Sequence, residues 1–88
     1  MSEPEDIMEF PCLFPIKAMG LASPQLQQTI LRIVQRHAPE VQTHHCKERP
    51  SKNGKYISIT VTIEATSRAQ LDAIYIDLNA SDHVVMTL

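Results

Sequence analysis

Residues 55–65 read KYISITVTIEA. Apolar side chains recur at every second position from Ile57 to Ala65, and hydroxyl or acidic side chains lie between them. A period of two is typical of a strand that buries one face and leaves the other in water. The stretch follows Asn53-Gly54, a strong hairpin signal because both residues accept positive φ. We therefore predict a half-buried strand that is entered from a two-residue turn.

The turn predicts the partner of this strand. The preceding residues, 43–50, form a weaker strand candidate, and a two-residue turn at positions 53 and 54 pairs residues whose numbers add to 107. Cys46 then faces Val61, and Lys47 faces Thr60. In this register Cys46 lies on the buried side of the sheet.

Four further elements follow on either side of the hairpin. Residues 12–19 alternate like a strand, although Pro15 lacks a backbone donor and restricts pairing to one side or produces a bulge. A helix is predicted to start at Ser23-Pro24 and to stop before Pro39, and a second to start at Thr66-Ser67. Residues 83–88 complete the pattern as a last strand.

The order strand, helix, strand, strand, helix, strand predicts an α+β fold. We expect the ferredoxin-like βαββαβ arrangement, a split βαβ sandwich with right-handed crossovers. Its antiparallel sheet has the strand order 4-1-3-2, and both helices cover one face. The other face is open and polar. Residues 1–9 are expected to form a flexible acidic tail, and residues 10–88 a single domain.

Composition sets the broad class of the protein. The chain has 88 residues, 43% of them hydrophobic, with a net charge of −2. No apolar run approaches the roughly 18 residues of a membrane helix. The acidic N-terminus lacks the basic and apolar regions of a signal peptide. We therefore expect a cytoplasmic protein in which Cys12 and Cys46 stay unpaired.

The open face of the predicted sheet carries several basic side chains. They are expected beside the hydroxyl groups of the central strand and are Lys17, His45, Lys47 and Arg49. Charged residues of this kind keep a sheet face soluble and protect an edge strand from aggregation. The alternative to this structural role is that the basic residues form a surface that binds an anion or a partner.

Other chemistries find little support in the sequence. His44 and His45 are neighbours in a predicted strand, where consecutive side chains point to opposite faces, so we expect no metal site. No spacing places Cys12 or Cys46 beside an oriented histidine, and we expect no enzyme and no cofactor. An RNA-binding sheet needs aromatic residues on its central strands, but the open face offers Tyr56 alone.

The chain resembles the YbeD-like family of small uncharacterised bacterial proteins. The resemblance runs from about residue 9 to residue 88 and is carried by six stretches. These are FPIKAMG (14–20), VQRHAP (34–39), SK (51–52), Y (56), IEAT (63–66) and VVMTL (84–88).

This resemblance implies a fold similar to ACT domains, which commonly bind amino acids and regulate attached enzymes. ACT domains often bind their ligand at the loop between the first strand and the first helix, which here is Gly20-Leu21-Ala22-Ser23. The loop lacks the Asp-x-x-Gly approach typical of those domains. We expect a non-catalytic regulatory domain, a monomer or weak homodimer, that binds a small metabolite or a protein partner. Weak binding of RNA or another polyanion through the open face is the alternative.

Overall fold

The computed structural model of the protein describes residues 9–88. The predicted acidic tail therefore lies outside the described residues, except for Glu9. Four strands and two α-helices alternate along the chain, with one short 3₁₀ helix. In order they are β1 (Cys12–Leu21), α1 (Leu26–Gln35), the 3₁₀ helix (Thr43–His45), β2 (Cys46–Pro50), β3 (Tyr56–Ala65), α2 (Arg68–Asn79) and β4 (Met86–Thr87).

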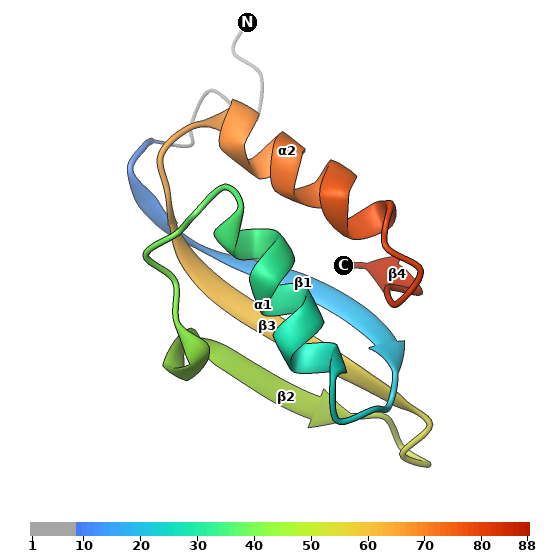
Figure 1. Cartoon of the computed structure of the whole chain (residues 1–88). Coiled ribbons are helices and arrows are strands. Elements are labelled where there is room, and N and C mark those ends of the chain that lie inside the picture. The colour runs from blue at the N-terminus through green and yellow to red at the C-terminus, as the bar shows by residue number, and fades with distance from the viewer. Residues whose placement is uncertain (1–8) are drawn as a thin grey trace, which may run out of the picture.

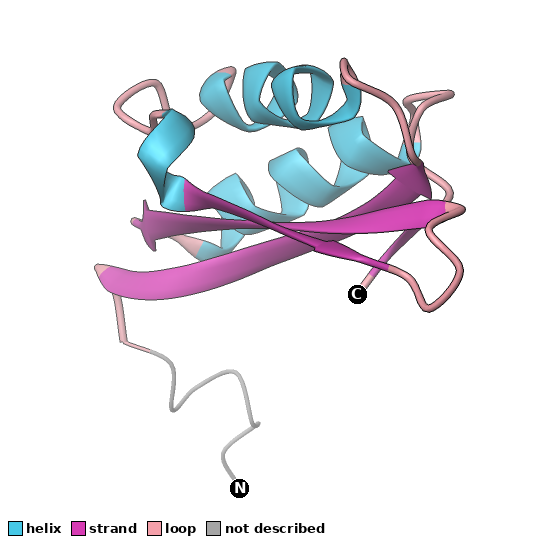
Figure 2. Ribbon diagram, turned by 90° about the horizontal axis from the view of Figure 1, so that it is seen from below, coloured by secondary structure: helices cyan, strands magenta, loops and turns pink. Residues whose placement is uncertain are grey.

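The predicted topology is confirmed. The strands form one sheet in the order β2-β3-β1-β4, and every pair is antiparallel (Figure 1). Figure 2 shows both helices on the same side of this sheet. No helix of residues 9–88 lies on the other side, which forms the open face.

The hairpin between β2 and β3 has the predicted register but a different turn. Cys46 pairs with Val61 and Lys47 with Thr60, as expected. The predicted two-residue turn is wrong, because residues 52–55 form a four-residue loop closed by bonds between Ser51 and Tyr56. Within this loop, only Gly54 has positive φ. The register is nevertheless as predicted, because the predicted two-residue turn and the observed four-residue loop are both centred on Asn53 and Gly54. The numbers of paired residues therefore still add to 107.

β1 is the central strand that links the two halves of the sheet. It pairs with β3 along its whole length, whereas β4 pairs only with Ala18 and Met19. The start of β1, which contains Pro15, is therefore paired on one side only, as predicted. At the other end, Gly20 is buried and lies directly against the backbone of His83.

The two helices begin in different ways. At α2 the predicted start at Thr66-Ser67 is confirmed, because Ser67 is the N-cap and its Oγ accepts a hydrogen bond from the backbone N–H of Gln70 at 3.1 Å. The predicted start of α1 at Ser23-Pro24 is wrong by two to three residues. Ser23 Oγ accepts a bond from Gln25 N–H, which forms a separate turn, and the first helical residue is Leu26.

Two strand predictions were too long. Residues 43–45 form the 3₁₀ helix, because Gln42 and His45 exchange bonds between side chain and backbone that replace ladder pairing. The last strand is Met86–Thr87 and not residues 83–88, since Asp82 and His83 form a turn that is closed by the hydrogen bond from Val84 N–H to the carbonyl of Ser81.

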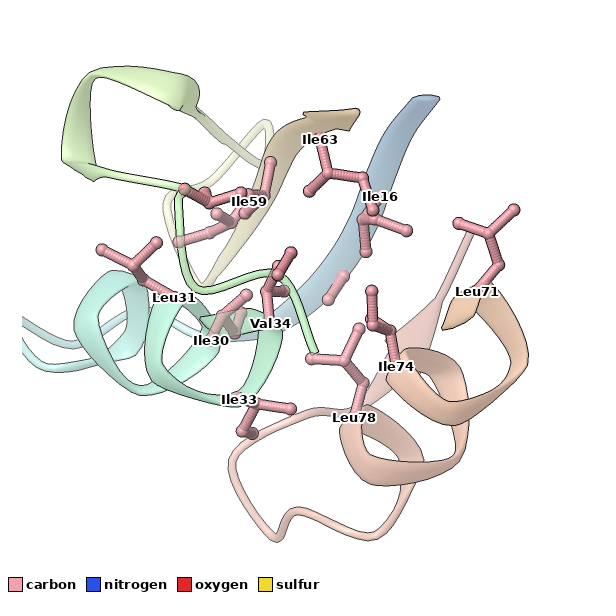
Figure 3. Packing of buried hydrophobic residues seen from close by; sticks show 14 of the residues in the cluster. Ile16, Ile30, Leu31, Ile33, Val34, Ile59, Ile63, Leu71, Ile74 and Leu78 are labelled. Carbon is pink, nitrogen blue, oxygen red and sulfur yellow. The ribbon is translucent and has the colours of Figure 1, made fainter. Parts of the chain in front are cut away.

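The core lies between the helices and one face of the sheet (Figure 3). From the sheet come residues at alternate positions, including Ile16, Ile59 and Ile63, all at most 1% exposed. From the helices come side chains such as Ile30 and Ile74, both fully buried. No polar or charged residue among residues 9–88 is buried, so the described part of the chain has a purely apolar interior.

Candidate functional site

The open face carries a compact set of cations, which we call the basic row: Lys17, Lys47 and Arg49. Lys17 of β1 and Lys47 of β2 both pair with Thr60 of β3, so they flank one residue on the same face. Two strand spacings separate the backbones of the two lysines by about 10 Å. Arg49 lies two residues further along, opposite Ser58. All three basic side chains are exposed.

His45 does not belong to this row by strand geometry. It precedes β2, and its Nδ1 accepts a hydrogen bond from the backbone N–H of Gln42 at 2.9 Å. The expectation that His44 and His45 point to opposite faces is also wrong, because their ring centroids lie only 4.0 Å apart. The 3₁₀ turn removes the strand alternation on which that expectation rested. Within residues 9–88, no group of three or more His, Cys, Asp or Glu side chains could hold a metal ion.

A second feature of the open face was not predicted. Large apolar side chains that are exposed or, for Met19, half-buried lie along β1 and at the C-terminal end of the chain, and we call them the apolar margin: Leu13, Met19, Leu21, Met86 and Leu88. Met86 pairs with Met19, and Leu88 donates its backbone N–H to the carbonyl of Lys17 at 3.0 Å, so the margin adjoins the basic row. The signal was present in the sequence, because the odd positions of residues 13–21 are largely apolar.

The aromatic content of the open face is small. Phe14 packs against the core, which leaves Tyr56 at the start of β3. Lys55 Nζ lies 5.6 Å from the centre of the Tyr56 ring and so occupies part of that surface. The described open face therefore lacks the pair of stacked aromatic residues that RNA-binding sheets use.

The loop between β1 and α1 is displaced by two residues from the predicted segment and covers residues 22–25. Gly20 and Leu21 belong to β1, so only Ala22 and Ser23 of the predicted ligand loop lie between the elements proper. Ala22 N–H donates to the carbonyl of Lys55 at 2.9 Å. A hollow of about 130 Å³ lies between this loop and the α2–β4 turn, lined by Leu21, Ser23, Leu26, Asp82, His83 and Val85. This volume is below the 300–1,000 Å³ typical of small-molecule pockets.

One ionic cluster connects the two helices on the other side of the molecule. His37 Nε2 lies 2.7 Å from Asp77 Oδ2, and Arg36 Nη1 lies 3.7 Å from the same oxygen. The hydrogen bond from His37, followed by the nearby charges, lowers the pKa of the Asp77 carboxyl below its ordinary value. Gln70 adds a third link, because its Nε2 donates to the carbonyl of His37 at 2.8 Å. The cluster joins the end of α1 to α2.

The thiols show little sign of activation. Burial, together with the negative charge of Glu48, raises the pKa of Cys46 above its ordinary value. A raised pKa reduces the thiolate fraction, and the thiolate is the nucleophile in cysteine chemistry. Cys12 and Cys46 are both free thiols.

No helix within residues 9–88 is long and apolar enough to cross a bilayer. The open face and the helical layer are both accessible, and each carries exposed apolar side chains, such as Leu13 on the former and Ile76 on the latter, which are 76% and 68% exposed.

Comparison with known proteins places the chain among relatives of nearly the same length. The family model "Protein of unknown function (DUF493)" matches residues 5–88. A UPF0250 protein of Neisseria gonorrhoeae is 41% identical over 91 residues, which cover 100% of both chains. A UPF0250 protein of Nitrosomonas europaea is 44% identical, with 96% of this chain and 94% of the relative covered.

A solved structure has the same fold. The solution structure of protein HP0495 from H. pylori superimposes with a TM-score of 0.65, and the match covers 100% of this chain and 97% of the other. The two sequences are 22% identical. At that identity the match supports the architecture alone.

Proposed function

We propose, from the premise that the chain belongs to the DUF493 family, that it is a non-catalytic binding domain whose open sheet face holds a protein partner. One observation carries this proposal. The same face carries three exposed cations and five exposed or half-buried apolar side chains. The partner surface that complements this pattern presents acidic groups beside an apolar strip.

The apolar margin favours a protein over a polyanion. Exposed apolar patches on small proteins mark interaction sites, because their burial on association releases water. A nucleic acid would be held by the cations and would leave most of the margin uncovered. The regulatory role implied by the ACT-like resemblance is consistent with a domain that acts by association.

The physical state of the cysteines supports a role without catalysis. A nucleophilic cysteine needs a lowered pKa or an adjacent base. Cys46 has a raised pKa. Among residues 9–88, neither His44 nor His45 forms a hydrogen bond with the Cys46 sulfur. We therefore assign the surface chemistry of this domain to recognition.

A set of matched variants tests the proposal. The parent is used to capture partners from a bacterial lysate treated with nuclease, in parallel with three variants. The first variant removes the basic row (Lys17→Gln, Lys47→Gln, Arg49→Gln). The second removes part of the apolar margin (Leu13→Ser, Leu21→Ser). The third is the control and changes an exposed residue of α2 (Ile76→Ser). We expect one stoichiometric protein that the parent and the control retain and that both open-face variants lose. Loss by the Ile76→Ser variant instead would move the interface to the helical layer and refute the proposal.

The basic row supports a second candidate, weak binding of RNA or another polyanion. Three phosphate contacts to a single strand predict that log K falls with log salt with a slope of about −2. Titration of the parent and the basic-row variant with single-stranded RNA at low and moderate salt measures this slope. Absence of binding by the parent at low salt rejects this candidate. Equal binding by both proteins would place a nucleic-acid surface elsewhere.

A further inference from the structure

The helical layer contains a groove that the proposed function does not use. α1 and α2 contact each other on the covered side of the sheet (Figure 1). Between them lies an open cavity of about 400 Å³. This volume falls in the range of 300–1,000 Å³ that small-molecule sites occupy in proteins. The groove is on the opposite layer from the basic row and the apolar margin.

The groove is formed by one stripe from each helix. α1 contributes Thr29, Arg32, Ile33 and Arg36, which follow the spacing i, i+3, i+4 and i+7 of a single helix face. Ile33 is 5% exposed and forms an apolar base. α2 and the segment after it contribute Asp77, Ser81 and His83 on the other side.

The charges in the groove leave a positive surplus. The oxygen Oδ2 of Asp77 is already engaged by His37 at 2.7 Å and by Arg36 at 3.7 Å. Within residues 9–88, these are the two ion pairs, so Arg32 has no carboxylate partner in that part of the chain. Arg32 and Arg36 lie one helical turn apart, and the guanidinium fork matches the geometry of a phosphate or carboxylate. Thr29 and Ser81 add hydroxyl groups, which are further donors to an oxyanion.

His83 is held at the end of the groove by a tight backbone contact. A Cβ on Gly20 would lie 2.3 Å from the carbonyl oxygen of His83, so the absence of a side chain at Gly20 allows this approach. The backbone N–H of His83 also donates to Ser81 Oγ at 3.2 Å. The segment that closes the groove is thus positioned by the end of β1.

We propose that the groove between α1 and α2 binds the oxyanion group, phosphate or carboxylate, of a small organic metabolite through Arg32 and Arg36. Arg32 is the main anchor, because Arg36 is shared with Asp77. The hydroxyl groups of Thr29 and Ser81 complete the donor set, and the base at Ile33 accommodates an apolar part of the ligand.

The test is a titration of the full chain with inorganic pyrophosphate and with citrate, followed by ¹H–¹⁵N NMR. We expect saturable shifts that are confined to residues 29–36 and 77–83. Arg32→Gln should weaken the affinity by about tenfold or more, the loss of one charge-assisted contact. Arg32→Lys, which keeps the charge but loses the fork, should weaken it less. Arg68→Gln, at the other end of α2, removes the same charge and should leave the affinity within about twofold.

Two results would overturn the proposal. Equal weakening by Arg32→Gln and Arg68→Gln would show that the anion responds only to net charge. Shifts centred on Lys17, Lys47 and Arg49 would place the anion on the basic row. Because Arg32 is exposed, its variants should fold, and amide shifts of the β3 core that match those of the parent verify this.

Discussion

Replacement of Gly20 by alanine should destabilise the protein by a steric mechanism. The added Cβ would lie 2.3 Å from the carbonyl oxygen of His83 and 2.8 Å from Cδ1 of Leu26. Real Cβ contacts essentially never fall below 3.0 Å, so the backbone at His83 must retreat by at least about 0.7 Å. Overpacking of this kind costs about 1–3 kcal/mol. A flexible side chain could rotate away, but a carbonyl oxygen moves only with its chain.

Gly54 provides a matched control with a different mechanism. Its φ is +78°, and no atom lies within 4 Å of the position of a Cβ. Alanine at this position costs about 1–2 kcal/mol because of its left-handed conformation, whereas asparagine tolerates that conformation. The order of the variants should therefore reverse. At position 54 asparagine should be more stable than alanine, and at position 20 alanine should be more stable than asparagine, which is larger.

Urea unfolding followed by circular dichroism measures the four free energies. The amide shifts of Val85 and Met86 in Gly20→Ala report whether the segment after α2 has moved. An unfolding midpoint equal to that of the parent, with unchanged shifts at these residues, would refute the steric reasoning. If the alanine and asparagine variants had the same order of stability at positions 20 and 54, the two glycines would not be required for different reasons, and this part of the reasoning would be refuted.

Three further predictions follow from the core, the ionic cluster and the thiol. Ile59→Ala should lower the free energy of unfolding by about 2–5 kcal/mol, and Thr60→Ala should lower it by less than about 1 kcal/mol. Equal losses for the two variants in urea unfolding would mean that both faces of β3 are buried. Because Asp77 has a lowered pKa in the folded state, its stabilising contribution is complete above the ordinary carboxyl range and is lost as pH falls through the folded value. The stability difference between the parent and Asp77→Asn should therefore shrink in thermal scans taken at successively lower pH below about 4, and a constant difference would contradict the assigned hydrogen bond. In a Cys12→Ser background at pH 8, iodoacetamide should modify Cys46 more slowly than free cysteine, and Glu48→Gln should increase the rate, as peptide mass spectrometry can measure.

The register of the sheet was predictable from the sequence, although the turn was not. The alternation in β3 and the position of Asn53-Gly54 fix which residues face each other, for any loop with an even number of residues centred on that pair. The loop itself depends on side-chain bonds. Asn53 Oδ1 accepts from Lys55 N–H at 3.1 Å, and Ser51 Oγ accepts from Tyr56 N–H at 3.0 Å. Periodicity does not contain this information, because Ser and Asn compete locally with the backbone ladder.

The same competition explains the errors at element ends. Ser23 was expected to cap α1, but it closes a turn before the helix, and His45 exchanges bonds with Gln42 where a strand was expected. Each residue can bond to the backbone in several local conformations, and the tertiary structure selects one.

The candidate sites were predictable to different degrees. The hairpin register placed Lys47 opposite Thr60, and the strand order placed Lys17 on the same face of the sheet, whereas its pairing with Thr60 was not predicted. Prediction of the groove would have required knowledge of which faces of α1 and α2 meet. The spacing of apolar residues within either helix does not contain this information. Arg32 and Arg36 carry a partial signal, since a spacing of four residues places both on one face. From the sequence they were indistinguishable from ordinary water-facing residues.

The two proposed surfaces share one short segment of the chain. Ser81 and His83 line the groove, while Met86 and Leu88, only three to five residues later, belong to the apolar margin. The segment is held by Val85 N–H on the carbonyl of Met19 at 2.7 Å and by Leu88 N–H on that of Lys17 at 3.0 Å. Because β4 has two residues, few bonds resist a displacement that begins at His83. An anion that changes the position of this segment must change the affinity of the open face for its partner, and by linkage the partner must change the affinity for the anion by the same factor.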